Sequence, residues 1–159
     1  MITWLTESAA GKFLMTFWIS VLPIVELRLG LPYGIALGLK YPLAVLAAVL
    51  GNMLPVPFII LFIKKVFAWL RKHWAKMDGF ICRMEAHAEK KGSKVRKYGK
   101  WALLLFVAIP APGTGAWTGS LIAALMNMPL KEAVPVIFLG VCMAAAIMTG
   151  ITFGVIHVF

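Results

Sequence analysis

Charged residues are scarce in this sequence, and acidic residues are the scarcest of them. Asp, Glu, Lys and Arg together make up 14% of the 159 residues, whereas hydrophobic residues make up 62%. A soluble domain carries about 25% charged residues, so the composition excludes an ordinary soluble domain. The apolar runs are continuous rather than alternating, which favours an all-α integral membrane protein over a transmembrane barrel.

Cysteine is also scarce, and recognisable catalytic motifs are missing. Cys82 and Cys142 lie in different segments without metal-ligand spacing, so the pattern indicates neither a metal site nor a disulfide framework. The sequence has no nucleophile–histidine pattern and no glycine-rich phosphate loop between a strand and a helix. We therefore expect no enzyme activity, no cofactor and no bound metal.

The basic residues are concentrated in one segment. Residues 64–100 contain twelve of the 16 Lys and Arg side chains and three acidic ones, hence nine of the ten formal positive charges. The positive-inside rule predicts that this segment is cytoplasmic. Its apolar residues recur at helical spacing, as in an amphipathic helix lying on anionic lipid, so we expect lipids as partners and not nucleic acid. The predicted membrane-surface residues are Lys64, Lys65, Arg71, Lys72 and Lys76.

Proline and glycine divide the apolar sequence into segments of two lengths. A full crossing needs about 20 residues at about 1.5 Å each. Segments 42–63 and 132–158 are long enough for this. The apolar pieces around the breaks near Pro23 and Pro110 have only roughly 8–11 residues and reach about half way. We therefore predict two re-entrant helical hairpins, at 12–39 and 101–126.

The two halves of the sequence are similar to each other. The segment Gly11-Lys12-Phe13 corresponds to Gly99-Lys100-Trp101, and Leu50-Gly51 corresponds to Leu139-Gly140, at offsets of 88 and 89 residues. A hairpin that returns to its own side plus one crossing is an odd number of crossings, so the second repeat is expected to be inverted, with both termini outside. We predict one membrane domain over 1–159, made of repeats 12–63 and 101–158 joined by a basic amphipathic helix within 64–100.

Two charges mark the tip of the first predicted hairpin. Glu26 and Arg28 lie in an otherwise uncharged stretch, where each charge costs at least ~2.5–3.5 kcal/mol on insertion scales. Pro23 and Pro32 bracket the pair and disfavour a continuous helix, and an unwound segment would place both side chains on one side. One hypothesis is that Arg28 binds an anionic group while Glu26 exchanges a proton or a cation. The alternative is a mutual ion pair that holds the loop.

The tip of the second predicted hairpin is uncharged. It combines flexible backbone with the start of a helix, whose free N–H groups attract anions, and Thr114 adds a hydroxyl. The alternative is a helix break that packs against the first tip and binds no ligand. The candidate residues are Pro110, Pro112, Gly113, Thr114 and Gly115.

These two tips carry a resemblance to a known family. The patterns Pro23-x-x-Glu26-x-Arg28-x-x-x-Pro32-x-Gly34 and Pro110-x-Pro112-Gly113-x-Gly115-x-x-x-Gly119 resemble the small multidrug export proteins, which are similar to the DedA (VTT-domain) membrane proteins. The resemblance covers nearly the whole chain and implies inverted re-entrant hairpins. DedA relatives are implicated in moving lipids such as polyprenyl phosphates, with proton coupling, and Glu26 matches their acidic position. The second hairpin of the DedA proteins carries arginines around its proline, whereas residues 108–112 of this chain contain none.

Three functions follow as hypotheses. The first is transport of an anionic lipid or amphipath, with Glu26 as the coupling acid. The second is export of amphipathic cations, which requires Glu26 as the main ligand and Arg28 as its structural partner. The third is a non-transporting membrane assembly factor that acts through the basic helix. A homodimer is compatible with a chain that has only two full crossings.

Overall fold

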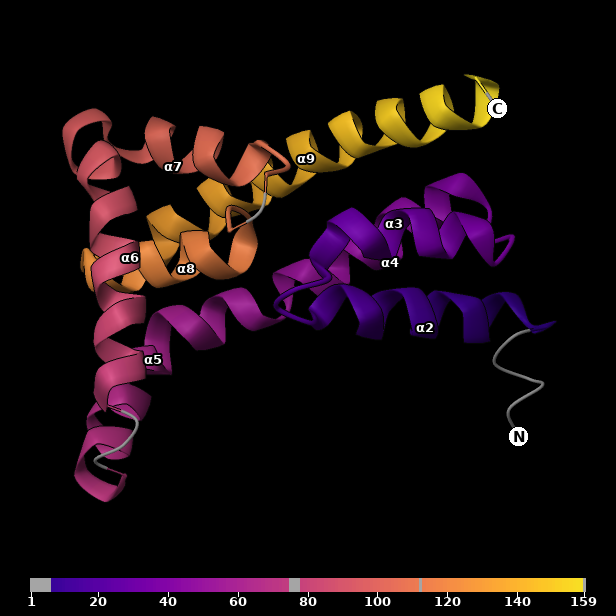
Figure 1. Cartoon of the computed structure of the whole chain (residues 1–159). Coiled ribbons are helices and arrows are strands. Elements are labelled where there is room, and N and C mark those ends of the chain that lie inside the picture. The colour runs from indigo at the N-terminus through magenta and orange to yellow at the C-terminus, as the bar shows by residue number, and fades with distance from the viewer. Residues whose placement is uncertain (1–6, 75–77, 112, 159) are drawn as a thin grey trace.

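The computed structural model describes residues 7–74, 78–111 and 113–158, without the side chains of 91–97 and 155–158. Throughout this part the chain is helical and has no strand, which confirms the predicted all-α class (Figure 1). The helices are α2 (Ala9–Val21), α3 (Glu26–Ala36), α4 (Tyr41–Met53), α5 (Pro55–His73), α6 (Asp78–Tyr98), α7 (Lys100–Ala108), α8 (Ala116–Leu125) and α9 (Leu130–Val158).

Within the described residues, two helical stretches have the length and composition of membrane spans. They are Tyr41–His73, which combines α4 and α5, and the α9 stretch Leu130–Gly154. Leu54 joins α4 to α5 with helical dihedral angles of −55° and −49°, so the helix continues across Pro55. These stretches correspond to the two predicted crossings, although the first continues past residue 63 to His73.

The sequence predicted one amphipathic helix within the basic segment, and the structure instead divides this segment between two helices. Its first part forms the last turns of α5, and residues 78–98 form α6, which runs across the ends of α5, α7 and α8 (Figure 1). Phe67 on α5 and Ile81 and Ala88 on α6 are buried, because the apolar side of this segment packs on neighbouring helices of the chain. That side is therefore not wholly available to lipid.

Arg71 links the two parts of the basic segment. Its guanidinium forms ion pairs with Asp78, at 3.0 Å, and with Glu85. Exposed ion pairs of this kind contribute about 0–1 kcal/mol each. The predicted surface cation Arg71 thus bonds to α6 in this structure.

The four remaining helices are short and form two hairpins. Helices α2 and α3 have 13 and 11 residues and are about 20 and 16 Å long, whereas α7 and α8 have 9 and 10 residues and are about 14 and 15 Å long. In the first hairpin, Gly30 and Gly34 pack against Ser20 and Thr16. Both hydroxyls donate to backbone carbonyls of their own helix at 2.8 Å, so the close contact leaves them bonded.

The two hairpins end in the same way. Gly38, with φ +76°, follows α3, and Asn127, with φ +54°, follows α8. The next residue in each case bonds back to the helix: Leu39 N–H to the Gly34 carbonyl at 3.1 Å, and Met128 N–H to the Ala123 carbonyl at 2.9 Å. Both ends are thus Schellman motifs, separated by 89 residues.

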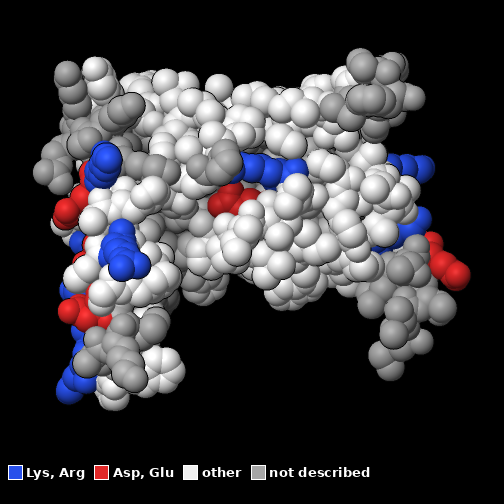
Figure 2. Space-filling model, viewed as in Figure 1, with Lys and Arg blue, Asp and Glu red and all other residues white. Residues whose placement is uncertain are grey.

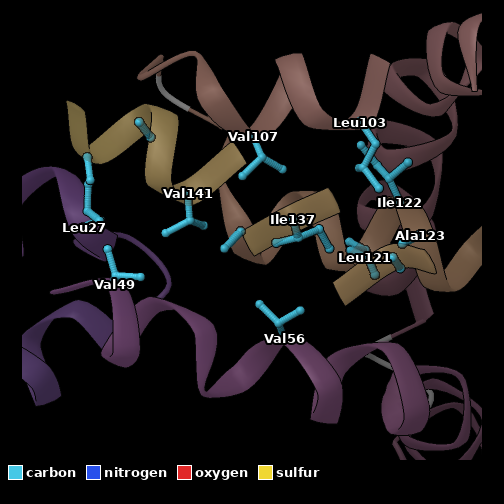
Figure 3. Close-up of a cluster of buried hydrophobic side chains, with 14 of the residues drawn as sticks. Leu27, Val49, Val56, Leu103, Val107, Leu121, Ile122, Ala123, Ile137 and Val141 are labelled. Carbon is cyan, nitrogen blue, oxygen red and sulfur yellow. The ribbon is translucent and has the colours of Figure 1, made fainter. Parts of the chain in front are cut away.

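The long helices also approach the hairpins through corresponding glycines. A Cβ on Gly51 would meet the Phe17 carbonyl, and a Cβ on Gly140 would meet the Leu104 carbonyl at 2.9 Å. Gly51 and Gly140 are 89 residues apart, whereas Phe17 and Leu104, which supply the carbonyls, are 87 apart. The second repeat therefore has two more residues than the first between its carbonyl and its glycine, and we assign them to the longer second tip. In the interior, side chains from both hairpins and both long helices meet in one core (Figure 3).

Candidate functional site

The tips of the two hairpins contact each other, and Glu26 is central to that contact. It is the first residue of α3 and has a left-handed φ of +48°, which is uncommon for a residue other than glycine. Its backbone N–H donates to the Leu22 carbonyl at 2.9 Å, and the residue is only 4% exposed. The turn after α2 therefore directs the carboxyl group into the protein.

The Glu26 carboxylate lies at the N-terminus of α8. Its Oε1 accepts the backbone N–H of Trp117, the second residue of α8, at 3.3 Å. The free N–H groups at a helix N-terminus and the helix dipole both favour a negative charge there. Gly115 precedes α8 with φ +113°, and a Cβ at this position would overlap the Glu26 carboxylate. Glycine is thus required both for the backbone conformation and for the approach of Glu26.

Arg28 binds the second tip at an adjacent point. Its Nη2 donates to the Thr114 carbonyl at 2.8 Å and to the Thr114 hydroxyl at 2.6 Å. The same hydroxyl lies 2.7 Å from the Ile109 and Ala111 carbonyls, and it accepts the Ala111 N–H at 3.2 Å. Thr114 therefore ties the turn together and presents it to Arg28.

Trp117 supplies a third connection between the tips. Its indole Nε1 donates to the Val21 carbonyl, the last residue of α2, at 3.0 Å. Trp117 was not among the residues predicted from the sequence. Its position two residues after the helix-breaking Gly115 is the available signal, because residues there carry the free N–H groups of a new helix. We call the contacts of Glu26, Arg28 and Trp117 across the two hairpins the tip junction.

The structure contradicts the alternative of a mutual ion pair between Glu26 and Arg28, and also the expected unwound segment around them. Among the described residues, the ion pairs do not include one between them, because each side chain bonds to the second tip instead. The pair also does not lie in an unwound segment that extends to Pro32. Helix α3 begins at Glu26 and contains Pro32, which removes only the helical donor of the Arg28 carbonyl.

The other predicted site residues lie around the junction or away from it. Pro23 is exposed in the first turn, Pro110 is partly buried in the second, and Gly113 is exposed with φ +75°. Pro112 and Lys76 lie outside the described residues. Of the basic residues, Lys64 donates to the Asn127 side chain, Lys65 lies 5.9 Å from the centre of the Phe62 ring, and Lys72 is exposed.

The surface places the tip junction within an apolar region. Charged side chains gather at the two ends of the face drawn in Figure 2, with a broad uncharged band between them. One small charged site interrupts this band, in the part of the molecule where Figure 1 shows α3 beginning. The described residues contain no group of three or more His, Cys, Asp or Glu side chains that could hold a metal ion.

Comparison with known proteins identifies the family. Residues 26–147 match the family described as "Putative small multi-drug export protein", a range that includes Glu26, Arg28, Thr114 and Trp117. Searches of curated proteins and of solved structures found no match. The family and the two long apolar helices together indicate a membrane protein. The chain belongs to the small multidrug export protein family.

Proposed function

We propose that this protein is a membrane exporter that exchanges protons for amphipathic cations, with Glu26 as the shared binding group. The observation that carries the proposal is a buried carboxylate, 4% exposed, whose hydrogen bond is to a neutral backbone N–H rather than to a cation. The family to which the chain belongs supports export as the activity.

The bond that holds Glu26 is suited to exchange. Most N–H···O bonds span about 2.7–3.2 Å, and the bond from Trp117 to Glu26 is longer, at 3.3 Å. A proton on the carboxylate removes the charge that the helix N-terminus stabilises. A bound cation competes for the same oxygens. Since one carboxylate holds either a proton or a cation, occupancy by one excludes the other, which is the requirement for exchange.

The surroundings of Glu26 suit a cation with an apolar body. Trp117 bonds Glu26 through its backbone N–H and its side chain is only partly buried, and an aromatic face attracts organic cations at about 0.5–2 kcal/mol. Arg28 is engaged by the Thr114 carbonyl and hydroxyl, so its role in this proposal is to hold the second tip in place. The cation hypothesis expected Arg28 to be the structural partner of Glu26; in this proposal Arg28 instead stabilises the second tip, and Glu26 remains the ligand.

The proposed mechanism uses two inverted repeats, each with a re-entrant hairpin and one crossing. Three observations support it: the four hairpin helices are about half to two thirds of the length of a span, the two hairpins share the same C-terminal motif, and corresponding glycines pack on corresponding carbonyls. Transporters of this kind bind substrate at the repeat interface and move one repeat against the other. The tip junction then lies near mid-membrane, with residues 64–100 cytoplasmic and both termini outside.

A second candidate is translocation of an anionic amphipath such as a polyprenyl phosphate. The observation in its favour is that Arg28 and the N-terminus of α8 lie side by side at the junction, and both attract anions. In this candidate a protonated Glu26 leaves the helix N-terminus, and the phosphate replaces it.

Transport by proteoliposomes distinguishes the two candidates. We would measure accumulation of a fluorescent organic cation under an imposed pH gradient and, separately, movement of a labelled anionic lipid. In the cation candidate, Glu26→Gln abolishes cation accumulation and Arg28→Lys leaves much of it, because lysine keeps the charge and one bond to Thr114. In the anionic candidate, Arg28→Lys is the more damaging, since lysine lacks the planar fork that binds phosphate.

Glu132→Gln is the matched control, because Glu132 is an exposed carboxylate in the first turn of α9. It should transport like the wild type. Cation accumulation by folded Glu26→Gln at the wild-type rate would refute the proposed role of Glu26. Failure of folded wild-type protein to move either substrate would refute both candidates.

A further inference from the structure

Besides the tip junction, two polar contacts join the proposed repeats, one at each end of the long helices. Tyr41, the first residue of α4, has its hydroxyl 2.8 Å from the Thr149 hydroxyl of α9. At the other end, Lys64 of α5 donates to the side chain of Asn127, which lies between α8 and α9. Each contact pairs the first long helical stretch with the second half of the sequence.

The tip junction lies between these two contacts. Gly51 packs on Ser20, which is next to the α2 residue whose carbonyl accepts the Trp117 indole N–H. Gly51 is ten residues, or about 15 Å, beyond Tyr41 in the same helical stretch, and Lys64 is 13 residues, or about 20 Å, beyond Gly51. The total of about 35 Å is close to the thickness of a bilayer core, about 30 Å. In the proposed topology, the Tyr41 contact is therefore at the outer surface and the Lys64 contact at the cytoplasmic one.

The inner contact is supported by a packed apolar core. Helix α5 lies against α8, and Val56, Ile59 and Phe67 on α5 are buried. Four consecutive residues of α8, 121–124, are buried as well. Separation at this end would expose these side chains to water that enters from the cytoplasm, which is unfavourable. The bond from Lys64 is therefore a minor part of what holds the inner end closed.

The outer contact has less packing behind it. Within the described residues of α9, the buried ones end at Ala145, and an added Cβ on Gly150 would have no atom within 4 Å. Tyr41 reaches this part of α9 in a second way, because its ring packs edge-on against Phe153 with 5.3 Å between the centroids. Regions with few buried apolar contacts open most easily, so the outer ends of α4 and α9 should separate before the inner ends do.

The outer contact can also open without leaving a buried polar group unpaired. The Thr149 hydroxyl donates its single proton to the Ala145 carbonyl at 2.7 Å, so the Tyr41 hydroxyl is the donor of the bond between them. When that bond breaks, Thr149 keeps its bond within the helix, and the Tyr41 hydroxyl meets water or lipid head groups at the membrane surface.

We propose that Tyr41, through its contacts with Thr149 and Phe153, is an outer latch whose release opens the protein towards Glu26 from the outside. The inference rests on the proposed exchange and adds which side opens more readily and which residue holds it closed. Breaking the latch costs one hydrogen bond and one ring contact. An exchanger needs such a small barrier on one side of its site, because the site must open and close in every cycle.

Distances between spin labels on the full-length protein in lipid nanodiscs test the latch. One pair of labels, at Leu43 and Ile151, reports on the outer ends of α4 and α9. The other pair, at Leu61 and Lys131, reports on the inner ends of α5 and α9. All four side chains are exposed, and the two native cysteines are replaced by serine.

Tyr41→Phe keeps the ring and loses the hydroxyl, whereas Thr149→Val keeps the shape and loses the acceptor. Each should raise the ratio of long to short outer distances by roughly 2- to 12-fold, the effect of one net hydrogen bond, and leave the inner distance unchanged. The double variant should open no further than either single one, because both lose the same bond. Tyr41→Ala should open further, since it also loses the contact with Phe153.

Thr152→Val is the matched control. The Thr152 hydroxyl donates to the Met148 carbonyl at 2.7 Å, as Thr149 does to Ala145, but Tyr41 bonds Thr149 instead. This variant should keep both wild-type distances. If Tyr41→Phe fails to fold, Thr149→Val makes the same test from the other side of the bond.

The latch is refuted if folded Thr149→Val and Tyr41→Ala keep the wild-type outer distances, if Thr152→Val opens the outer ends equally, or if the inner ends separate instead. Such a result would leave the exchange proposal standing, because transport dependent on Glu26 is measured separately. Opening in the latch variants of a protein that moves no organic cation would support the latch and overturn the exchange.

Discussion

Replacement of Gly115 by alanine tests whether the tip junction holds the two hairpins together. Gly115 has φ +113° and ψ −171°, a region populated almost only by glycine. A Cβ at this position would overlap the Glu26 carboxylate, so Gly115→Ala disturbs the backbone and also displaces Glu26 from the N-terminus of α8. Both effects act on the folded state.

The expected cost is the sum of two terms. Holding alanine in this conformation costs about 1–3 kcal/mol. Loss of the bond between Glu26 and the Trp117 N–H costs about 1.5–3 kcal/mol for a charged acceptor, and its 3.3 Å length places it at the lower end. Together they predict a decrease of about 2.5–4.5 kcal/mol in the free energy of unfolding.

Equilibrium unfolding in mixed micelles, followed by tryptophan fluorescence, measures this decrease. Gly154→Ala is the matched control, because no atom lies within 4 Å of a Cβ at that position in α9. It should be neutral or stabilising by about 0.5–1 kcal/mol, since alanine favours a helix. Combination with Glu26→Ala removes the overlap, so the double variant should be at least about 1.5 kcal/mol more stable than the sum of the single effects predicts. Additive effects, or a cost for Gly115→Ala no greater than for Gly154→Ala, would refute the reasoning.

Two further predictions concern the hairpins. Ile24 lies in the turn of the first hairpin and is 91% exposed, and the proposed re-entrant geometry places it in lipid. An Ile24→Cys variant, with Cys82 and Cys142 replaced by serine, should therefore not react with a membrane-impermeant maleimide added to either side. Labelling from the cytoplasmic side would instead mean that α2 and α3 cross the membrane completely. Gly51→Ala and Gly140→Ala should each destabilise the protein by about 1–3 kcal/mol, because a Cβ at either position meets a backbone carbonyl of a hairpin helix. Gly150→Ala is the control and should not destabilise the protein, because no atom lies within 4 Å of a Cβ at that position. Unequal effects of the first two substitutions on unfolding would argue against corresponding roles for the two glycines.

The sequence was informative about elements whose cause is local. Continuous apolar runs predicted the helices, and Pro23 and Pro110 correctly marked the two turns. Pro32 was a misleading signal, because a proline disturbs one helical hydrogen bond and the surrounding helix can continue. The change of direction between α5 and α6 was also missed, since the apolar spacing in the sequence continues from one helix into the next.

The contacts across the tip junction could not be predicted from one sequence. Glu26 and Trp117 are 91 residues apart, and Arg28 and Thr114 are 86 apart. Glu26 and Arg28 were selected because charge is costly in an apolar segment. That argument requires each charged group to have hydrogen-bonding partners, but it does not say which groups these are. Which groups satisfy them depends on how the hairpins pack, which the local pattern does not encode. Trp117 was missed for the same reason, because its bond to Glu26 comes from a backbone N–H, which every residue except proline has.

The Glu26 and Arg28 side chains have their hydrogen-bonding partners only while the two hairpins are in contact. A direct bond between Glu26 and Arg28 would leave both charges neutralised within one hairpin, wherever the second hairpin moved. Here each charge obtains its partner from the other hairpin, so separation of the tips would leave a carboxylate and a guanidinium without hydrogen-bonding partners in an apolar environment. Separation therefore becomes favourable only when another group replaces those partners. In the proposed exchange, a proton or an organic cation does this for Glu26, and this requirement ties movement of the hairpins to occupancy of the site.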